Sequence, residues 1–175
     1  MKQNKVNNKL VYTWGVKFNL LSVHELVEVI NPEVKTGHSP IHITGVNPET
    51  VVHASKNETI RKAILESDLV NVDNALVVLV LRILGYKVPG RAATPDLFEA
   101  LLKLASDERY KVFILGAKES VLQTAIQNIK NDYPYLEIEG QDGYYSREKE
   151  NEVIEKINLF APDMQIGRAS CRERV

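Results

Sequence analysis

Residues 67–85 read SDLVNVDNALVVLVLRILG, a short strand pattern that runs into an apolar helix pattern. The run from Asp68 to Val72 is brief and rich in β-branched residues, which favours a buried strand. Residues 75–84 are apolar on nearly all sides, as in a buried helix, and Gly85 is a suitable helix stop. A strand that leads into a helix is the unit from which parallel sheets are built.

The same alternation continues on both sides of this unit. Further strands are predicted over residues 9–18, 40–46, 110–116 and 135–139. Helices are predicted from Ser22, where Glu25 completes a capping box, from Asn47-Pro48 and from Asn57, and over residues 94–106, 119–131 and 146–160. We therefore predict one α/β domain with a Rossmann-like fold, in which helices cover both faces of a mainly parallel sheet.

The composition is that of a globular protein of ordinary length. Hydrophobic residues make up 44% and charged residues 26% of the 175 residues, which excludes a disordered or fibrous chain. The 22 Lys and Arg residues are balanced by 23 Asp and Glu residues, for a net charge of −1. We therefore expect no nucleic-acid partner, and any site for a polyanion has to be local.

Cysteine usage and hydropathy indicate a cytoplasmic protein. Cys171 is the single cysteine, so a disulfide framework and a cysteine-based zinc site are both excluded. The first fifteen residues lack the apolar core of a signal peptide, and the run at residues 75–81 is shorter than the roughly 18 residues that a membrane span needs.

Residues 165–175, QIGRASCRERV, break the pattern of the preceding chain. GRASCRERV resembles the translation of a sequencing-adaptor oligonucleotide. We therefore expect the native domain to cover residues 1–164, and residues 165–175 to be an artefactual tail in which Cys171 has no function.

Ligands of open α/β sheets bind at the carboxyl ends of the strands, which directs attention to three strand–helix junctions, at residues 44–47, 73–74 and 116–117. Asp73 is a candidate general base there, or else a helix N-cap. Asn47 is likewise an N-cap, a ligand contact, or both. Gly116 allows a backbone to approach a phosphate, or forms a tight turn, and no GxGxxG or P-loop pattern accompanies it.

Two further polar residues lie in or after the loop at residues 85–93. Arg91 is suited to pair with a phosphate or carboxylate, although most loop arginines face water. Asp96, in the first turn of the next helix, is explained either by the helix dipole or by function. The four histidines have no metal-ligand spacing, so no metal site is predicted.

Five segments together resemble the WecG/TagA/CpsF glycosyltransferases over about residues 15–164. They are ITGVNPETVVHASKN, SDLVNVDNALVV, YKVPGRAATPDLFEALL, YKVFILGAKESV and GYYSREKENEVIEKIN. The resemblance implies a metal-independent, inverting transferase that moves a hexose or N-acetylhexosamine-type sugar from a UDP-sugar to a lipid-linked or other saccharide acceptor. It implies no separate cofactor, a role in teichoic-acid-type or other cell-surface polysaccharide synthesis, and peripheral contact with the inner face of the plasma membrane.

The resemblance also assigns roles to individual residues. It implies that Asp73 is the catalytic base, with Asn74 where the family usually has Gly. The family's Thr-x-Asn segment falls on residues 44–47: Asn47 matches, Gly45 occupies the usual Thr position, and Thr44 is its neighbour. Arg91 and Asp96 match the family's loop Arg and helix-opening Asp. With Gly116, these residues form the predicted substrate site.

The end of the chain departs from the family pattern. The family continues beyond a segment like APDM into another strand, a Gly-x-Pro-x-Gln-Glu motif and a basic C-terminal part. Since these are missing, we expect a truncated chain with an exposed sheet edge that associates with copies of itself and turns over poorly. A catalytically inert nucleotide-binding domain is the alternative function. A receiver-like signalling module is disfavoured, because Asn19-Leu20-Leu21 stands where such a module has an acidic cluster.

Overall fold

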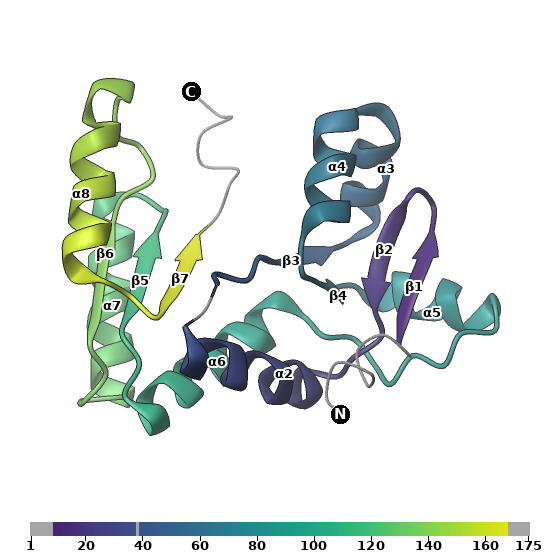
Figure 1. Cartoon of the computed structure of the whole chain (residues 1–175), viewed down its shortest axis with the longest axis horizontal. Coiled ribbons are helices and arrows are strands. Elements are labelled where there is room, and N and C mark those ends of the chain that lie inside the picture. Colours follow the sequence, from purple (N-terminus) through teal and green to yellow (C-terminus); the bar gives the residue numbers. More distant parts are fainter. Residues whose placement is uncertain (1–8, 38, 168–175) are drawn as a thin grey trace. The chain divides into compact units, whose positions relative to one another are not determined.

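The structure is a computed structural model that describes residues 9–37 and 39–167 (Figure 1). By its internal contacts the chain divides into two compact units, Met1–Leu101 and Leu102–Val175, and each unit is described by itself. Strands and helices alternate in both units, and parallel strand pairs occur in both. The predicted α/β class with parallel strands is therefore confirmed.

The first unit opens with a β-hairpin rather than with the single strand that was predicted over residues 9–18. Strands β1 (Leu10–Thr13) and β2 (Val16–Asn19) pair antiparallel. Between them, Trp14 and Gly15 both have positive φ angles, 52° and 75°, as the two-residue turns of tight hairpins require. Tryptophan is unusual at such a position, and the alternating pattern on both sides of the turn concealed the reversal.

Two parallel strands form the centre of the first unit. Strand β3 (Ile43–Val46) pairs with β4 (Leu69–Val72), and the connection consists of helices α3 (Pro48–Lys56) and α4 (Glu58–Glu66). Strand β2 lies beside β4 (Figure 1). The β3–α3–α4–β4 crossover is the unit that the sequence predicted.

Both faces of β4 are buried. Val70 and Val72 belong to a core cluster with residues of β2 and of helix α5 (Ala75–Ile83). Leu69, which points the other way along the strand, belongs to a second cluster with residues of helices α2 (Val23–Thr36) and α6 (Thr94–Glu108). Helices thus cover both faces of this strand pair, which explains why the strand sequence is apolar throughout.

Helix α5 differs from its prediction. It was expected to be buried on nearly all sides, but only Val77, Val78 and Leu81 are buried. Its opposite side is exposed, and Leu79 there keeps 54% of its surface accessible. The prediction of a fully buried helix is therefore wrong for one face.

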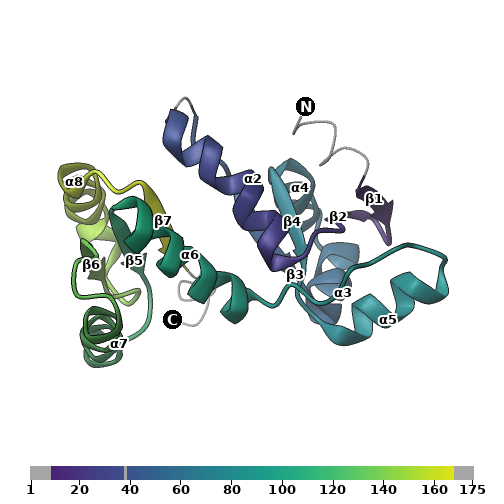
Figure 2. The same ribbon diagram turned by 90° about the horizontal axis from the view of Figure 1, so that it is seen from below.

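The second unit is a three-stranded parallel sheet with helices. Strand β5 (Val112–Leu115) lies between β6 (Ile138–Gln141) and β7 (Met164–Gly167). The connections contain helix α7 (Glu119–Asp132) and the pair η1 (Arg147–Lys149) and α8 (Glu150–Phe160) (Figure 2).

Strand β7 corrects one expectation about the end of the chain. The strand that should follow the APDM segment was expected to be missing, but β7 begins at Met164 and pairs with β5 through Gly167. Residues 165–167 of the supposed tail are therefore part of the sheet. Residues 168–175 lie outside the described residues, and the foreign origin of the tail and the single-domain boundary stay predictions.

Candidate functional site

Asn47 and Asp73 lie at the same edge of the first unit. In the parallel register Val46 stands opposite Val72, so the next residue of each strand leaves the sheet at the same level. The N–H of Asp73 donates to the carbonyl of Val46 over 3.2 Å. The predicted placement of these two residues at neighbouring strand ends is confirmed.

The Asp73 side chain is half-buried and connects two elements. Its Oδ1 atom accepts from the backbone N–H of Thr94 at 2.5 Å. It does not cap α5, because Asn74 does so by accepting from the N–H of Leu76 at 2.8 Å. Among residues 9–37 and 39–167 no donor to the second oxygen of Asp73, Oδ2, is found, and the role of Asp73 as a base stays a prediction.

Gly45 makes room for this arrangement. A Cβ atom at position 45 would lie 2.6 Å from Oγ1 of Thr94 and 3.3 Å from both Nδ2 of Asn71 and Cβ of Asp73. Gly45 of β3 thus lies next to Asn71 of β4, to Asp73 at the end of β4 and to Thr94 at the start of α6. The Thr94 hydroxyl occupies the space that a side chain at position 45 would need, and Thr94 was not predicted as a site residue.

Asn71 is a second residue that the prediction missed. It is buried, with 1% of its surface exposed, and its Nδ2 group donates to the carbonyl of Ala92 at 2.6 Å. The N–H of Ala92 in turn donates to the carbonyl of Val72 at 2.9 Å. An amide inside the apolar strand LVNV was the available signal, since a buried polar side chain needs a partner.

Asn47 has the capping role that was one of its two interpretations. Its Oδ1 atom accepts from the N–H and the hydroxyl of Thr50, at 2.9 and 3.0 Å. Thr44 stands apart from the group around Asp73, because alternate residues of a strand point to opposite faces and Gly45 is its neighbour. The binding roles of Asn47, Asn74 and Thr44 stay predictions.

The loop after α5 brings Arg91 to this edge. The Arg82 guanidinium donates to the carbonyl of Val88 at 2.9 Å and shapes the loop, and the bond of Ala92 to the end of β4 fixes the residue next to Arg91. Arg91 and Asp96 face each other, with Nη2 and Oδ2 3.8 Å apart and side chains 51% and 59% exposed. This loose, exposed pair leaves the guanidinium accessible to an anion.

Gly116 lies in the second unit, directly after β5. It is buried, its N–H donates to the carbonyl of Gln141 at 3.0 Å, and its φ angle is 150°. Glycine tolerates that angle, so the tight-turn interpretation fits the geometry. Its meeting with Asn47 and Asp73 at one edge stays a prediction.

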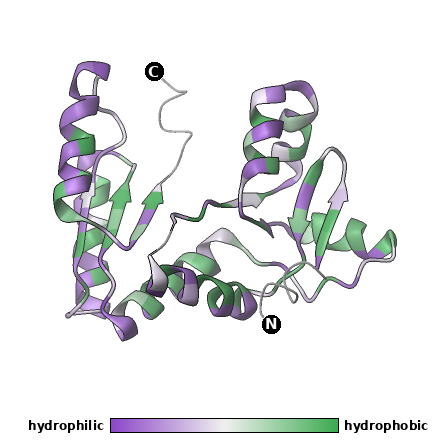
Figure 3. Ribbon diagram, in the orientation of Figure 1, coloured by the Kyte–Doolittle hydropathy of each residue, from purple (hydrophilic) through white to green (hydrophobic). Residues whose placement is uncertain are grey.

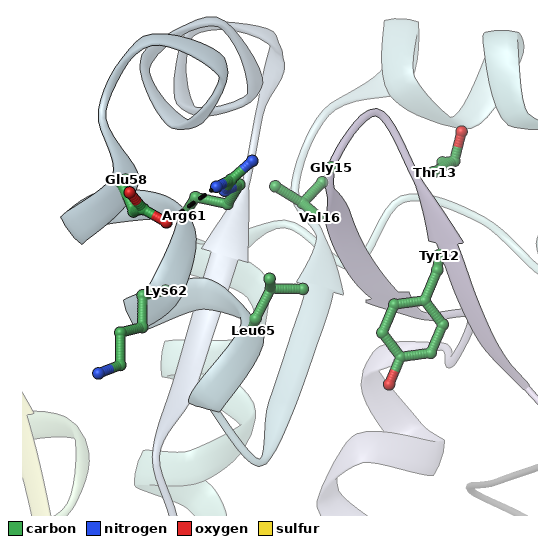
Figure 4. Close-up of a pocket in the computed structure, with 8 residues that line it drawn as sticks. All are labelled: Tyr12, Thr13, Gly15, Val16, Glu58, Arg61, Lys62 and Leu65. Carbon is green, nitrogen blue, oxygen red and sulfur yellow. Dashed lines mark hydrogen bonds and ion pairs between the residues drawn. The ribbon is translucent and has the colours of Figure 1, made fainter.

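Two surface pockets in the first unit contain none of the predicted site residues. The larger, about 540 Å³, lies between the hairpin and α4 and is lined by Tyr12, Thr13, Gly15, Val16, Glu58, Arg61, Lys62 and Leu65. Figure 4 shows that Lys62 points away from the hairpin and that Arg61 pairs with Glu58. The smaller, about 160 Å³, is apolar and lined by Trp14, Pro48, Val51, Leu76, Val77 and Val80. Pro48 and Leu76 place it beside the caps Asn47 and Asn74.

The part of the chain that the structure describes contains neither a metal-binding cluster nor a membrane-spanning helix. No group of three or more His, Cys, Asp or Glu side chains is arranged there to hold a metal ion. No helix within residues 9–37 and 39–167 has both the length and the apolar composition to cross a bilayer.

Comparison with known proteins identifies relatives over most of the chain. An N-acetylglucosaminyldiphosphoundecaprenol N-acetyl-beta-D-mannosaminyltransferase of Bacillus spizizenii is 34% identical over 123 residues, which are 70% of this chain and 47% of the relative. The enzyme of that name from Bacillus subtilis is 30% identical over 122 residues, with the same two shares. Its namesake from Staphylococcus aureus is 27% identical over 162 residues, 92% of this chain and 63% of the relative.

The chain spans about half the length of the two Bacillus relatives. The model of the glycosyl transferase WecG/TagA/CpsF family matches residues 11–166, a range that contains the hairpin, the strand pair with Asp73 and the second sheet. The chain therefore belongs to the WecG/TagA/CpsF family of glycosyl transferases.

Proposed function

We propose that this chain supplies the donor-binding and catalytic part of an inverting glycosyltransferase. The donor is a UDP-sugar with a hexose or N-acetylhexosamine, and the acceptor is a saccharide carried on a polyprenyl diphosphate. The names of the relatives, which transfer N-acetylmannosamine to N-acetylglucosaminyldiphosphoundecaprenol, support this substrate class. The reaction would take place in the cytoplasm, at the inner face of the plasma membrane.

The observation that carries the proposal is the position of Asp73 at the end of β4, next to the end of β3. In the proposed reaction Oδ2 of Asp73 takes the proton of an acceptor hydroxyl. That oxygen attacks the anomeric carbon while the bond from that carbon to the UDP oxygen breaks on the opposite face. The centre is inverted, and in this proposal Arg91 stabilises the negative charge on the departing diphosphate.

We further propose that the reaction needs no metal ion or other cofactor. Stabilisation of the leaving UDP then depends on protein cations and on N–H groups at helix starts. Activity that is unchanged by EDTA is the expected result, and loss of activity with EDTA that Mg²⁺ restores contradicts this part of the proposal.

An inert nucleotide-binding domain is the second candidate. The observation that favours it is the bond from Thr94 to Asp73, which gives the carboxylate a structural task. The two candidates differ in turnover and not in binding. An inert domain binds UDP without forming a saccharide product.

The test is a transferase assay with a panel of UDP-hexoses and UDP-N-acetylhexosamines and an N-acetylglucosaminyl diphosphate lipid as acceptor. The chain should be assayed alone and joined to the C-terminal part of a relative. We expect product with one donor class in the joined protein and weak turnover in the chain alone. UDP binding in both forms without product from either contradicts the enzymatic proposal.

A further inference from the structure

The hydroxyl of Thr94 lies at the edge of the first unit where β3 and β4 end. A Cβ atom at position 45 would lie 2.6 Å from Oγ1 of Thr94 and 3.3 Å from Cβ of Asp73, so the hydroxyl and the Asp73 side chain flank the same point. The backbone N–H of Thr94 donates to Oδ1 of Asp73, which holds the two residues together. Ligands of open α/β sheets bind at this edge.

Thr94 is exposed, whereas the residues that hold it in place are buried. Ala92 and Ala93 are 0% and 3% exposed. Ala92 is bound to β4 twice, through its N–H to the carbonyl of Val72 and through its carbonyl to Nδ2 of Asn71. Thr94 therefore belongs to a fixed piece of backbone, and a group that is already fixed loses little conformational freedom when it binds a ligand.

The Thr94 hydroxyl differs from other hydroxyls on the helices of this protein. Those of Thr36, Ser55 and Thr124 donate to a backbone carbonyl three or four residues earlier, at 3.1, 2.8 and 2.9 Å. Thr94 is the first residue of α6, so α6 itself offers no earlier carbonyl. Within residues 9–37 and 39–167 the structure shows no hydrogen bond of the Thr94 hydroxyl. A hydroxyl can donate one hydrogen bond and accept two, which suits it to a ligand hydroxyl.

Helix α5, which follows Asp73 in the sequence, offers mainly apolar side chains. Its ribbon is green over most of its length in Figure 3. The polar residue at its start is Asn74, whose side chain accepts from the helix backbone at 2.8 Å. Asn47 caps α3 in the same way. The Thr94 hydroxyl is therefore a polar group next to Asp73 that does not serve as a helix cap.

The charges around this point favour a neutral saccharide over a phosphate. The Asp73 carboxylate flanks the point itself. Two further carboxylates lie in the first turns of the helices that begin at this edge, Asp96 in α6 and Glu49 in α3. The cation Arg91 faces Asp96, with Nη2 and Oδ2 3.8 Å apart. A phosphate at the Thr94 hydroxyl would meet these negative charges, whereas a sugar hydroxyl is neutral and bonds both to carboxylates and to hydroxyls.

We propose that Thr94 is a specificity-determining residue for the acceptor saccharide. Its hydroxyl bonds to the acceptor hydroxyl on the ring carbon next to the reacting one, while Asp73 takes the proton of the reacting hydroxyl. Hydroxyls on adjacent ring carbons lie side by side, as the two side chains do around position 45. A site that hydrogen-bonds a substrate hydroxyl rejects an analogue that lacks it. This inference rests on the proposed transferase function and states how the same site selects its acceptor.

The first measurement is binding of the acceptor to the full chain, which needs no turnover. The probe is N-acetylglucosaminyl diphosphate on a short polyprenyl chain, titrated calorimetrically in the presence of UDP. Thr94→Val keeps the size of the side chain and the N–H that bonds to Asp73. It should raise the acceptor Kd about 3- to 10-fold, the worth of one hydrogen bond. Thr94→Ser keeps the hydroxyl and should bind the acceptor more tightly than Thr94→Val does.

The second measurement changes the acceptor instead of the protein, so it does not depend on the folding of a variant. Acceptors that each lack one ring hydroxyl are titrated against the wild type. The one that lacks the hydroxyl bound by Thr94 should bind about 3- to 10-fold more weakly than the complete acceptor. With Thr94→Val this acceptor and the complete one should bind equally, because the two changes remove the same hydrogen bond.

Two controls separate a ligand contact from a structural role. Thr124→Val removes an exposed hydroxyl from α7 in the second unit and should leave acceptor binding as in the wild type. The Kd of UDP, titrated alone, should be similar in the wild type and Thr94→Val. If Thr94→Val weakens UDP and acceptor binding equally, Thr94 has a structural role and the proposal is overturned.

Three other results also overturn the proposal. The first is an acceptor Kd of Thr94→Val equal to that of Thr124→Val. The second is a wild type that binds every acceptor lacking one hydroxyl as tightly as the complete one, or that binds no acceptor. The third is an unchanged acceptor Kd with weaker binding of a UDP-sugar relative to UDP, which would assign the hydroxyl to the donor sugar. By contrast, a chain that selects its acceptor through Thr94 but forms no product contradicts the proposed function and supports this inference.

Discussion

The N–H of Thr94 donates to Oδ1 of Asp73 at 2.5 Å and thereby joins the start of α6 to the end of β4. The residue proposed as the catalytic base therefore also fixes the position of a helix. Substitutions of Asp73 act on both tasks, and the choice of substitution decides which task is tested.

Asp73→Asn separates the two tasks, because the amide oxygen can still accept from Thr94 while the basic carboxylate is lost. We expect kcat to fall by about 10²- to 10⁴-fold, the usual contribution of a general base, with UDP affinity largely kept. Steady-state kinetics and calorimetric titration of UDP measure the two effects. Asp107→Asn, an exposed carboxylate on α6, is the control, and near-normal turnover by Asp73→Asn would assign Asp73 to structure alone.

Gly45→Ala should destabilise the protein by about 1–3 kcal/mol, because the new Cβ would lie 2.6 Å from Oγ1 of Thr94. Thr94→Ala removes that oxygen and should recover part of the loss in the double variant. The free energies of unfolding of the two single variants and the double variant, from urea denaturation, give the coupling. Strictly additive effects would show that the two positions do not compete for space.

Asn71→Asp should be more destabilising than Asn71→Ala. The alanine variant leaves the carbonyl of Ala92 without its donor, at a cost of about 1–3 kcal/mol. In the wild type, 2.6 Å separates Nδ2 of Asn71 from the carbonyl oxygen of Ala92. The aspartate variant puts a carboxylate oxygen in place of that nitrogen, so a buried negative charge faces the carbonyl oxygen. Urea denaturation at pH 7 ranks the two, with the exposed Asn158→Asp as a control for the charge change. Equal losses for both Asn71 variants would contradict this account.

Glu25 makes the start of α2 sensitive to acid. Its carboxylate bonds to Lys9 Nζ at 2.6 Å and to the N–H and hydroxyl of Ser22, both at 3.0 Å. The bond from Lys9 and the backbone N–H of Ser22 lower the pKa of Glu25 from 4.5 to about 2. A lowered pKa means that this stabilisation is complete above about pH 4.5 and is lost as the pH falls toward 2.

The difference in unfolding free energy between wild type and Glu25→Gln should therefore shrink over that pH range. At pH 7 we expect the wild type to be about 1 kcal/mol more stable, since a capping interaction and a partly exposed ion pair are lost together. Thermal unfolding at several pH values measures the difference. A difference that is constant from pH 7 to pH 2 would contradict the assigned role of the ion pair.

Features that depend on neighbouring residues could be predicted from the sequence. The capping box of Ser22 and Glu25 and the caps Asn47 and Asn57 are local patterns, and the structure contains all of them. The placement of Asn47 and Asp73 at one edge followed from the topology of parallel strands.

Features that depend on distant partners could not be predicted. The Asn71–Ala92 and Asp73–Thr94 hydrogen bonds each join residues 21 positions apart. No local sequence pattern predicts such a pairing. The exposed face of α5 was missed for a related reason, because apolar composition does not reveal whether a partner covers a helix. The hairpin turn at Trp14 was missed because a tryptophan with positive φ is rare.

Asn19 has a consequence for the order of folding. Its buried side chain accepts from the N–H of Val70 at 2.8 Å, across 51 positions of sequence. During synthesis the hairpin leaves the ribosome well before β4, so this amide stays hydrated until the chain up to Val70 has emerged. The hairpin therefore makes this contact with the parallel pair only after β4 has been synthesised, and the contact has to offset the entropy lost on closing a loop across 51 positions.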